Sequence, residues 1–294
     1  MKDFLITGAA GFIGSKLLSY LISKGESVNG FDNFKFSHKK NYLKNSKYLI
    51  KCDILNKKDL AKILPKFKHI IHLAAVDNRK LFVDKFDKSN QINIEGTKNI
   101  LDIINNNQKL TYFSSNMVYG EGYKLPFTEI HPVNAYEPYA LSKLCSENLI
   151  KSYFFKKKFD YLIIRNFNTF GPGQNEKSLI PTMILQAHKE KKIDVWSPNT
   201  TRDFQYIDDC IRNTYKLLKI KSRNFTVNLG TGKANKMKDV ATKISKIFQC
   251  KINSLNKSIP ISHKNYADIK LLNKVLKNKV TQTNLDKALE LTSN

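Results

Sequence analysis

Three glycines at three-residue spacing, within residues 7–14, constrain the fold of this chain more than any other feature. They follow an apolar run and lead into a helical pattern of apolar residues over 12–24. A strand that turns at glycine and reopens as a helix directs backbone N–H groups and the positive end of the helix dipole toward one point. That point suits a pyrophosphate. We expect the turn at Gly8, close approach of the phosphates at Gly11, and close packing of helix on strand at Gly14.

The second predicted strand, residues 27–31, leads to Asp32, which indicates the type of nucleotide. The glycine spacing is GxxGxxG instead of the usual GxGxxG, so the turn alone is also compatible with an ordinary strand-to-helix connection. A carboxylate at the end of this strand can accept hydrogen bonds from both hydroxyls of an adenosine ribose and repels a 2′-phosphate. The pattern therefore favours NAD over NADP. The alternative is that Asp32 is a turn residue in an Asp-Asn pair.

Strand and helix patterns alternate through the first half of the chain. Apolar runs predict strands at 3–7, 27–31, 48–53, 69–75, 110–114 and 161–165. Helical periodicity and a terminating proline predict helices at 12–24, 57–63, 89–105 and 136–157. This alternation indicates the α/β class with a Rossmann-type doubly wound parallel sheet, whose ligand crevice lies at the carboxyl ends of the strands. Further helices are expected at 178–190, 207–220 and 284–291, and a further strand at 225–229.

Composition argues against a metal centre and a membrane span. The four cysteines are scattered and have no histidine at ligand spacing, which predicts neither a zinc site nor a disulfide framework and favours the reducing cytoplasm. No apolar run approaches the roughly 18 residues of a membrane helix, and the glycine turn begins within seven residues of Met1. We expect a cytoplasmic protein that binds no membrane and no metal.

The formal charge of +25 raises the question of nucleic-acid binding. Only five of the 50 basic residues are arginines, and the lysines are spread over nearly every predicted helix and loop. Nucleic-acid binding would require clustered basic residues with aromatic or arginine partners. The distribution favours a solvated lysine coat and no nucleic-acid partner, although a basic field would speed the arrival of anionic ligands.

The strand predicted at 110–114 is followed by Ser115, and a Tyr139-x-x-x-Lys143 pair follows on a predicted helix. Residues four apart on a helix share a face, and a lysine ammonium favours the phenolate of a tyrosine whose unperturbed pKa is about 10. Tyr139 is therefore a candidate acid/base, and Ser115 could share its proton or hold a substrate oxygen. Alone, this spacing is a common coincidence in a chain with 13 tyrosines; its place after the glycine turn favours function.

These motifs, taken together, resemble the extended short-chain dehydrogenase/reductases, and in particular the NAD-dependent nucleotide-sugar epimerase/dehydratase family that includes UDP-glucose 4-epimerases. The resemblance covers most of the chain. It rests on TGAAGFIG at 7–14, Asp32, Asp53, HLAA at 72–75, Asn93 with Gly96 and Thr97, SSNMVYG at 114–120, YALSK at 139–143, RNFNTFGPGQ at 165–174 and RDFQYIDD at 202–209.

The resemblance implies a tightly held NAD and assigns roles to residues in these motifs. Tyr139 would be the acid/base, Lys143 would bond the nicotinamide ribose, and Ser115 would be the partner of Tyr139. The residues implied in cofactor binding are Gly8, Gly11, Phe12, Ile13, Gly14, Asp32, Asn33, Asp53, Ile54, Leu73, Ala74, Ala75, Tyr139 and Lys143.

The resemblance also implies two domains and a substrate site. Residues 1–166 would form the NAD-binding domain, to which later segments at about 202–232 return, and 167–294 would form mainly the nucleotide-sugar domain. Asn168 would bind the substrate diphosphate and Arg202 a phosphate, which suits an amide donor and a guanidinium fork. Ser115 and Asn116 would contact the sugar.

Two departures from the family pattern refine the expected reaction. Dehydratases and decarboxylases of this family carry an acidic residue in the pair after the catalytic Ser/Thr, whereas this chain has Asn116 and Met117. That argues against dehydration and decarboxylation. The chain also has no arginine after residue 223, whereas relatives have one near the C-terminus that binds the diphosphate. His263 or Lys264 could replace that arginine.

The sequence thus predicts 4-epimerisation of a nucleotide sugar, with UDP-hexoses favoured over GDP- or dTDP-sugars, through a transient 4-keto intermediate. The alternatives are a 4-ketoreductase or 4-dehydrogenase using the same residues and, further off, an NAD-binding sensor or scaffold without chemistry. A homodimer through the helices at 89–105 and 136–157 is also expected from the resemblance.

Overall fold

The computed structural model describes residues 1–37, 39–76, 91–121, 124–221, 223–255 and 264–293. The chain divides into two compact units, and each of them is built from three separate segments of the sequence. Unit 1 comprises residues 1–120, 133–165 and 217–227, and unit 2 comprises residues 121–132, 166–216 and 228–294.

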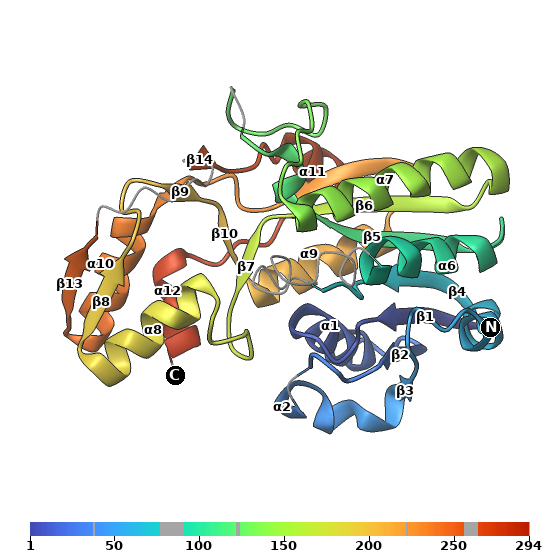
Figure 1. Cartoon of the computed structure of the whole chain (residues 1–294), viewed down its shortest axis with the longest axis horizontal. Coiled ribbons are helices and arrows are strands. Elements are labelled where there is room, and N and C mark those ends of the chain that lie inside the picture. Colours follow the sequence, from blue (N-terminus) through green and yellow to red (C-terminus); the bar gives the residue numbers. More distant parts are fainter. Residues whose placement is uncertain (38, 77–90, 122–123, 222, 256–263, 294) are drawn as a thin grey trace. The chain divides into compact units, whose positions relative to one another are not determined.

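Unit 1 is built on a seven-stranded parallel sheet flanked by helices, which confirms the predicted fold class (Figure 1). The strand order is β11-β6-β5-β4-β1-β2-β3, so the order reverses between β1 and β4, where a doubly wound sheet binds its ligand. The strands are β1 (Lys2–Thr7), β2 (Val28–Asp32), β3 (Leu49–Lys51), β4 (Phe67–His72), β5 (Lys109–Ser115), β6 (Asp160–Asn166) and β11 (Phe225–Leu229).

Helices cover this sheet and bury its apolar side chains. They are α1 (Phe12–Ser23), α2 (Lys39–Tyr42), α3 (Lys57–Ile63), α6 (Gly96–Ile103) and α7 (Pro138–Lys157), with a π-helical turn at Gln91–Glu95 and 3-10 turns at Leu43–Tyr48, Leu64–Lys66 and Asn116–Tyr119. One core cluster joins the sheet to α3, α6 and α7 and includes Ile70, Ile100 and Ile150, all fully buried. The unalternating apolar strands fit a sheet that is covered on both faces.

The strand predicted at 69–75 ends earlier than expected, at His72. The backbone N–H of Leu73 still donates to Thr7 O at 3.2 Å, but the next N–H, of Ala74, donates to the Thr7 hydroxyl at 3.0 Å. The chain therefore leaves the ladder at this point to pass over the glycine turn. Similarly, the strand predicted at 48–53 is limited to Leu49–Lys51.

The helix predicted at 89–105 also differs from the prediction in its first described turn and in its end. Residues 89 and 90 lie outside the described residues, the π-helical turn occupies Gln91–Glu95, and α6 ends at Ile103 because Ile104 adopts a non-helical conformation before an asparagine run. The π-helical turn brings Asn93 into the interior, where it is 1% exposed.

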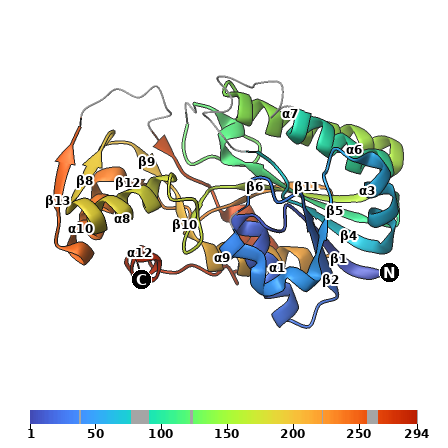
Figure 2. The ribbon, with the colours of Figure 1, turned by 60° about the horizontal axis from the view of Figure 1, so that its bottom comes forward.

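Unit 2 contains three small sheets and five helices among the residues described. Figure 2 shows β8 and β13 beside α8 and α10. The helices are α8 (Leu179–Glu190), α9 (Ile207–Lys219, whose last residues belong to unit 1), α10 (Met237–Phe248), α11 (Lys270–Val275) and α12 (Leu285–Ser293). The strands are β7 (Asn168–Phe170), β8 (Lys192–Val195), β9 (Thr201–Arg202), β10 (Phe204–Tyr206), β12 (Asn235–Lys236), β13 (Lys251–Ser254) and β14 (Lys264–Asn265).

A fully buried carboxylate, Asp203, joins distant segments of unit 2. It accepts hydrogen bonds from the hydroxyl and backbone N–H of Thr231 at 2.5 and 2.8 Å, from Gly232 N at 2.9 Å and from Ala267 N at 3.2 Å. Burial raises the pKa of Asp203, and these hydrogen bonds oppose the rise. The carboxylate thus fixes the Gly-Thr-Gly loop and residue 267 beside the strand that carries Arg202.

Candidate active site

The glycine turn has the geometry of an open anion cradle. Gly8 has φ +68°, and the N–H of Gly11 donates to Gly8 O at 3.1 Å, which closes the turn directly before α1. The N-cap of α1 is Gly11, which has no side chain to cap the helix, and the first turn carries no acidic residue. The first amides of α1 are therefore available to a bound phosphate, and the dipole of α1 favours its charge. This cradle fits a dinucleotide pyrophosphate.

Gly14 is required for close packing of α1 on the turn, and its replacement gives a first prediction. A Cβ at this position would lie 2.2 Å from Gly8 O, a distance that real Cβ atoms essentially never show. Gly14→Ala is therefore expected to displace α1, weaken NAD binding at least tenfold and cost about 1–3 kcal/mol of stability. Calorimetric titration with NAD and urea unfolding measure the two effects.

Gly25→Ala is the matched control for Gly14→Ala. Gly25 has φ +73°, but a Cβ there meets no atom within 4 Å. The control should cost about 1 kcal/mol through backbone strain alone and leave the NAD affinity unchanged. Equal NAD affinity in the Gly14 variant and wild type would contradict the packing role.

The two acidic residues predicted to bind the cofactor, Asp32 and Asp53, lie at the end of β2 and just after β3. Asp32, 9% exposed, accepts hydrogen bonds from Ala10 N at 3.1 Å and Phe34 N at 2.8 Å, so its carboxylate is fixed against the glycine turn. Asp53 accepts from the Asn33 amide at 3.0 Å and from Leu55 N at 3.1 Å.

Hydrogen bonds also determine the direction in which the pKa of Asp53 shifts. Partial burial acts to raise the pKa of Asp53, but the hydrogen bonds from Leu55 N, Asn33 and Lys35 outweigh it and lower the pKa. The carboxylate therefore stays ionised. Ile54 is buried beside it and contacts Gly96 of α6. This places Asp32, Asn33, Asp53 and Ile54 at the carboxyl ends of neighbouring strands, as expected for one nucleotide site.

Of the predicted catalytic residues, Tyr139 and Lys143 lie on α7, and Lys143 is held against β5, the strand that ends at Ser115. Lys143 is 3% exposed, and its Nζ donates to Phe113 O on β5 at 2.8 Å. The same Nζ lies 5.8 Å from the centroid of the Tyr139 ring, one helical turn earlier. Ser115 ends β5, two residues after Phe113, and its Oγ accepts from Met117 N at 3.2 Å. The ammonium is thus fixed next to the phenol ring by a strand whose end carries Ser115.

A buried ion pair supports this arrangement, and the sequence did not predict it. Glu147, fully buried on α7, receives two hydrogen bonds from Arg165, at 3.0 Å from Nε and 2.8 Å from Nη2. Ser114 Oγ donates to the same carboxylate at 2.5 Å, and the Arg165 guanidinium stacks 4.8 Å from the Tyr119 ring centroid. The pair therefore joins α7 to β5 and β6 one turn after Lys143.

The residues predicted to bind the substrate diphosphate, Asn168 and Arg202, lie in unit 2. The Asn168 amide donates to Asp203 O at 3.1 Å, and Arg202 Nη1 donates to Thr201 O at 3.0 Å. Arg202 lies on the central strand of the β12-β9-β14 sheet, in register with Asn235 and Asn265. Asn116, predicted to contact the sugar, lies in unit 1 on the 3-10 turn after β5 and is 6% exposed.

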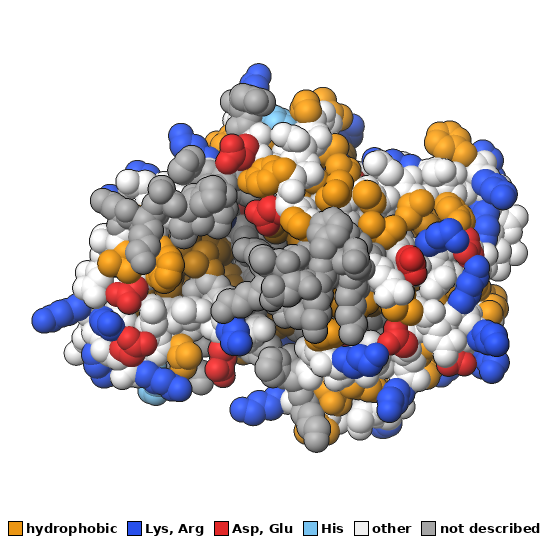
Figure 3. Space-filling model, viewed as in Figure 1, with side chains coloured by type: hydrophobic (Ala, Val, Ile, Leu, Met, Phe, Trp, Pro, Cys, Tyr) orange, Lys and Arg blue, Asp and Glu red, His pale blue; other side chains and the backbone are white. Residues whose placement is uncertain are grey.

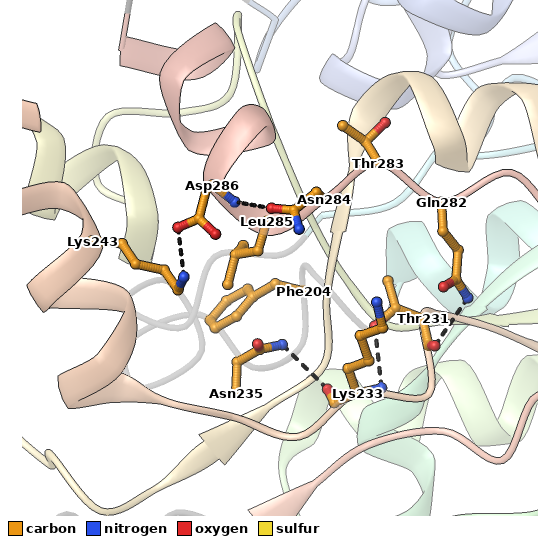
Figure 4. A pocket seen from close by; sticks show the side chains of 10 residues that line it. All are labelled: Phe204, Thr231, Lys233, Asn235, Lys243, Gln282, Thr283, Asn284, Leu285 and Asp286. Atoms are coloured by element: carbon orange, nitrogen blue, oxygen red, sulfur yellow. Dashed lines mark hydrogen bonds and ion pairs between the residues drawn. The ribbon is translucent and has the colours of Figure 1, made fainter.

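A small pocket of about 190 Å³ lies within unit 2, and none of the ten residues that line it is a predicted site residue (Figure 4). Its charged side chains include Lys243 and Asp286, which pair with each other at 2.5 Å. The Gln282 amide donates to Thr231 O at 3.0 Å. We assign this pocket no part in the chemistry.

Lysine and arginine side chains are scattered over the face seen in Figure 3 and are interrupted by acidic and neutral ones. Many pair locally, as Lys57 and Lys98 do with Asp102 at 2.6 and 3.1 Å.

Among the described residues, no group of histidine, cysteine and acidic side chains is arranged to hold a metal ion. Over the same residues, no helix has the length and apolar character needed to cross a membrane.

Two buried histidines on β4 predict a stability that depends on pH. Burial lowers the pKa of both His69 and His72 to about 3, helped by Arg223, Lys109 and Lys219 near the first and by Lys143 near the second. Because their pKa values are lower in the folded than in the unfolded state, the unfolded chain binds more protons below pH 6.5. Acidification from pH 6.5 toward 4 should therefore destabilise the protein by up to about 1.4 kcal/mol per pH unit for each histidine.

Urea midpoints at pH 7, 6 and 5 measure this dependence. His188→Gln, at an exposed position, serves as the control and should retain the slope, whereas His69→Gln should reduce it by about half. A stability that is flat between pH 7 and 5 would show that neither buried ring resists protonation.

A parallel sheet with an open glycine turn at its switch point, together with a Tyr-Lys pair on α7 that is held against β5, is the arrangement of a Rossmann-type enzyme that uses a dinucleotide cofactor. The model of the NAD dependent epimerase/dehydratase family matches residues 4–230. The chain belongs to this family and is an NAD-dependent enzyme, as the sequence predicted.

Individual relatives agree with this assignment. The chain is 34% identical over 248 residues to a putative UDP-glucose 4-epimerase of Methanocaldococcus jannaschii, covering 80% of this chain and 79% of the relative. It is 32% identical over 255 residues to a UDP-glucuronate 4-epimerase of Thermodesulfobacterium geofontis, covering 79% and 76%. The solved UDP-glucuronic acid 4-epimerase of Bacillus cereus, in complex with UDP-glucuronic acid and NAD, superposes with a TM-score of 0.90 at 29% identity over 99% of this chain and 98% of that one.

Proposed function

We propose that this protein is a nucleotide-sugar 4-epimerase that acts on a UDP-hexose through a transient 4-keto intermediate. The observation that carries the proposal is the position of Lys143 on α7. Its buried ammonium lies beside the Tyr139 ring and is fixed by Phe113 O, on the strand that ends at Ser115. The pair Asn116 and Met117 after Ser115 offers no carboxylate for dehydration. The relatives described as UDP-sugar 4-epimerases support the same reaction.

Each protein group has one task in this reaction. NAD bound at the glycine turn supplies the hydride acceptor and donor for the sugar C4′. Tyr139 Oη takes the proton of the 4′-hydroxyl as the ketone forms and returns it after the keto sugar presents its other face. The positive charge of Lys143 stabilises the phenolate that accepts this proton and that forms again when the proton is returned. Ser115 Oγ orients the 4′-oxygen.

We further propose that Asn168 and Arg202 bind the diphosphate, because an amide donor and a guanidinium fork match phosphate oxygens. Lys264 is proposed to replace the C-terminal arginine of relatives, since it precedes Asn265, the residue in register with Arg202 on the neighbouring strand. His263, the other predicted replacement, lies outside the described residues.

The test is incubation of the purified protein with UDP-glucose, UDP-glucuronate and their GDP counterparts without added cofactor. An epimerase restores its cofactor in each cycle, so UDP-sugar should be converted to its 4-epimer with catalytic amounts of bound NAD. Conversion only with stoichiometric NAD(P)H or NAD⁺ would replace the proposal with a net 4-ketoreductase or 4-dehydrogenase.

We also propose a cytoplasmic homodimer that associates through the helices predicted at 89–105 and 136–157, the second of which is α7. Its outward-facing side chains include Leu141 and Phe155, which are 41% and 73% exposed, while Phe154 packs on the core. The free state of all four cysteines suits a reducing compartment. Light scattering should give twice the mass of 33.8 kDa for the native chain and the monomer mass for Phe155→Lys.

A further inference from the structure

The two histidines of β4 are equally buried but have different partners. Among the described residues, His69, 6% exposed, has one side-chain hydrogen bond, between Nε2 and Thr111 Oγ1 at 2.8 Å. His72, 1% exposed, is bonded at both ring nitrogens, at 2.8 Å from Nδ1 to Thr7 Oγ1 and at 3.0 Å from Nε2 to Thr97 Oγ1. Thr7 directly precedes the glycine turn, and Thr97 lies in the first turn of α6. His72 therefore connects these two elements through the interior.

Which group donates in each hydrogen bond follows from which of the groups carry a hydrogen and which can only accept. Thr97 has one hydroxyl proton and lies 2.6 Å from Asn93 O, which can only accept, so Thr97 Oγ1 accepts from His72 Nε2–H. Thr7 Oγ1 accepts from Ala74 N at 3.0 Å, and its own proton is then directed to His72 Nδ1. His72 is thus a neutral imidazole with its proton on Nε2, and the chain of hydrogen bonds runs in one direction from Ala74 to Asn93.

This chain of hydrogen bonds starts in the segment that carries Leu73, Ala74 and Ala75, three residues that the resemblance implies in cofactor binding. Ala74 lies so close to the glycine turn that a Cβ on Gly8 would be 2.7 Å from Ala74 N. Two residues later, Val76 is fixed by Asn93, whose Oδ1 accepts from Val76 N at 2.9 Å and whose Nδ2 donates to Val76 O at 3.3 Å. The segment 73–76 is therefore fixed at two points, and both lead to Asn93.

The same residues reach the catalytic helix. Asn93 Nδ2 donates to Ser142 Oγ at 2.9 Å, and Ser146 Oγ donates to Asn93 O at 3.2 Å. Ser142 directly precedes Lys143 on α7. A change at His72 would consequently alter hydrogen bonds that position the glycine turn and the helix that carries Tyr139 and Lys143.

We propose that His72 is a positioning residue for NAD, which sets the segment 73–76 against the glycine turn through Thr7 and against α6 and α7 through Thr97. The role concerns cofactor binding and does not depend on which sugar is the substrate. His69, on the same strand and with a single threonine partner away from the turn, is assigned no such role.

The test compares His72→Phe with His69→Phe in NAD titrations of protein freed of its cofactor, with urea unfolding as a parallel measurement. Both variants should lose stability. His72→Phe should weaken NAD binding at least tenfold, and His69→Phe less than threefold. His72→Asn should recover more affinity than His72→Gln, because its carboxamide can occupy the place of Nδ1 and bond Thr7. NAD affinities of the two Phe variants within threefold of each other would overturn the proposal.

A second pair of variants, which changes the side-chain volume less, tests the same proposal if the Phe variants do not fold. Thr7→Val removes the hydroxyl that joins His72 to Ala74, and Thr111→Val removes the single partner of His69, each with little change in volume. The Thr7 variant should bind NAD at least fivefold more weakly than the Thr111 variant. Equal affinities would show that the hydrogen bonds of His72 do not position the cofactor site.

Discussion

Tyr139→Phe is expected to reduce the turnover number of this enzyme by about 10²- to 10⁴-fold, because the variant keeps the ring but loses the group that moves the proton. The ring is retained beside Lys143 Nζ, so the hydrogen bond of Lys143 to Phe113 O should persist. Turnover with UDP-sugar and NAD affinity are measured on the same preparation. We expect NAD affinity to change by less than threefold.

Tyr153→Phe is the control for this experiment, since Tyr153 lies on the same helix and donates its hydroxyl to Asp102 at 2.6 Å. It should lose some stability and keep turnover within a few-fold of wild type. A Tyr139→Phe variant that turns over within tenfold of wild type would exclude Tyr139 as the acid/base.

Arg165→Met is expected to destabilise the protein by about 3–5 kcal/mol, because it leaves the Glu147 carboxylate buried without its cation. Burial opposes the charge on Arg165, but the hydrogen bonds and charge of Glu147 outweigh it and raise the pKa of Arg165 above its usual range. Urea midpoints measure the loss. Because Glu147 lies one turn after Lys143, turnover should fall as well.

The double variant Arg165→Met/Glu147→Leu distinguishes a broken pair from lost packing. Replacing both partners by apolar residues removes the unpaired charge, so the double variant should be more stable than Arg165→Met alone. A double variant with the summed loss of both single variants would show that the two residues are not coupled.

The sequence predicted the parts of the fold that have strong local signals. The strand ending at Thr7, the turn at Gly8 and the α7 helix each span enough residues for apolar periodicity or glycine spacing to be recognised. The strands β7, β9, β10, β12 and β14 have two or three residues each, too few for any period, and the sequence did not predict them. The roles of Tyr139, Lys143 and Asp32 stay predictions that the structure makes testable.

Long-range polar contacts were the other part that sequence reasoning missed. Arg165 was placed in a motif, yet its partner Glu147 is 18 residues away and no spacing rule connects a helix residue to a particular strand residue. His72 was noted only as part of HLAA, although a histidine that is buried in a central strand must find polar partners. Such a residue is a usable signal that something distant bonds it, but the identity of Thr7 and Thr97 follows only from the fold.

The return of residues 217–227 to unit 1 also determines when its sheet can be completed during synthesis. Strand β6 has its outer neighbour, β11, roughly 60 residues further along the chain, which at ordinary ribosomal rates is a delay of about 3–12 s. Throughout that interval one edge of β6 can pair with other chains. A protein shortened after residue 166 would keep that edge permanently open, so fragments of this enzyme should aggregate. In the nascent chain, residues 166–216 of unit 2 must be made before the sheet of unit 1 can be closed.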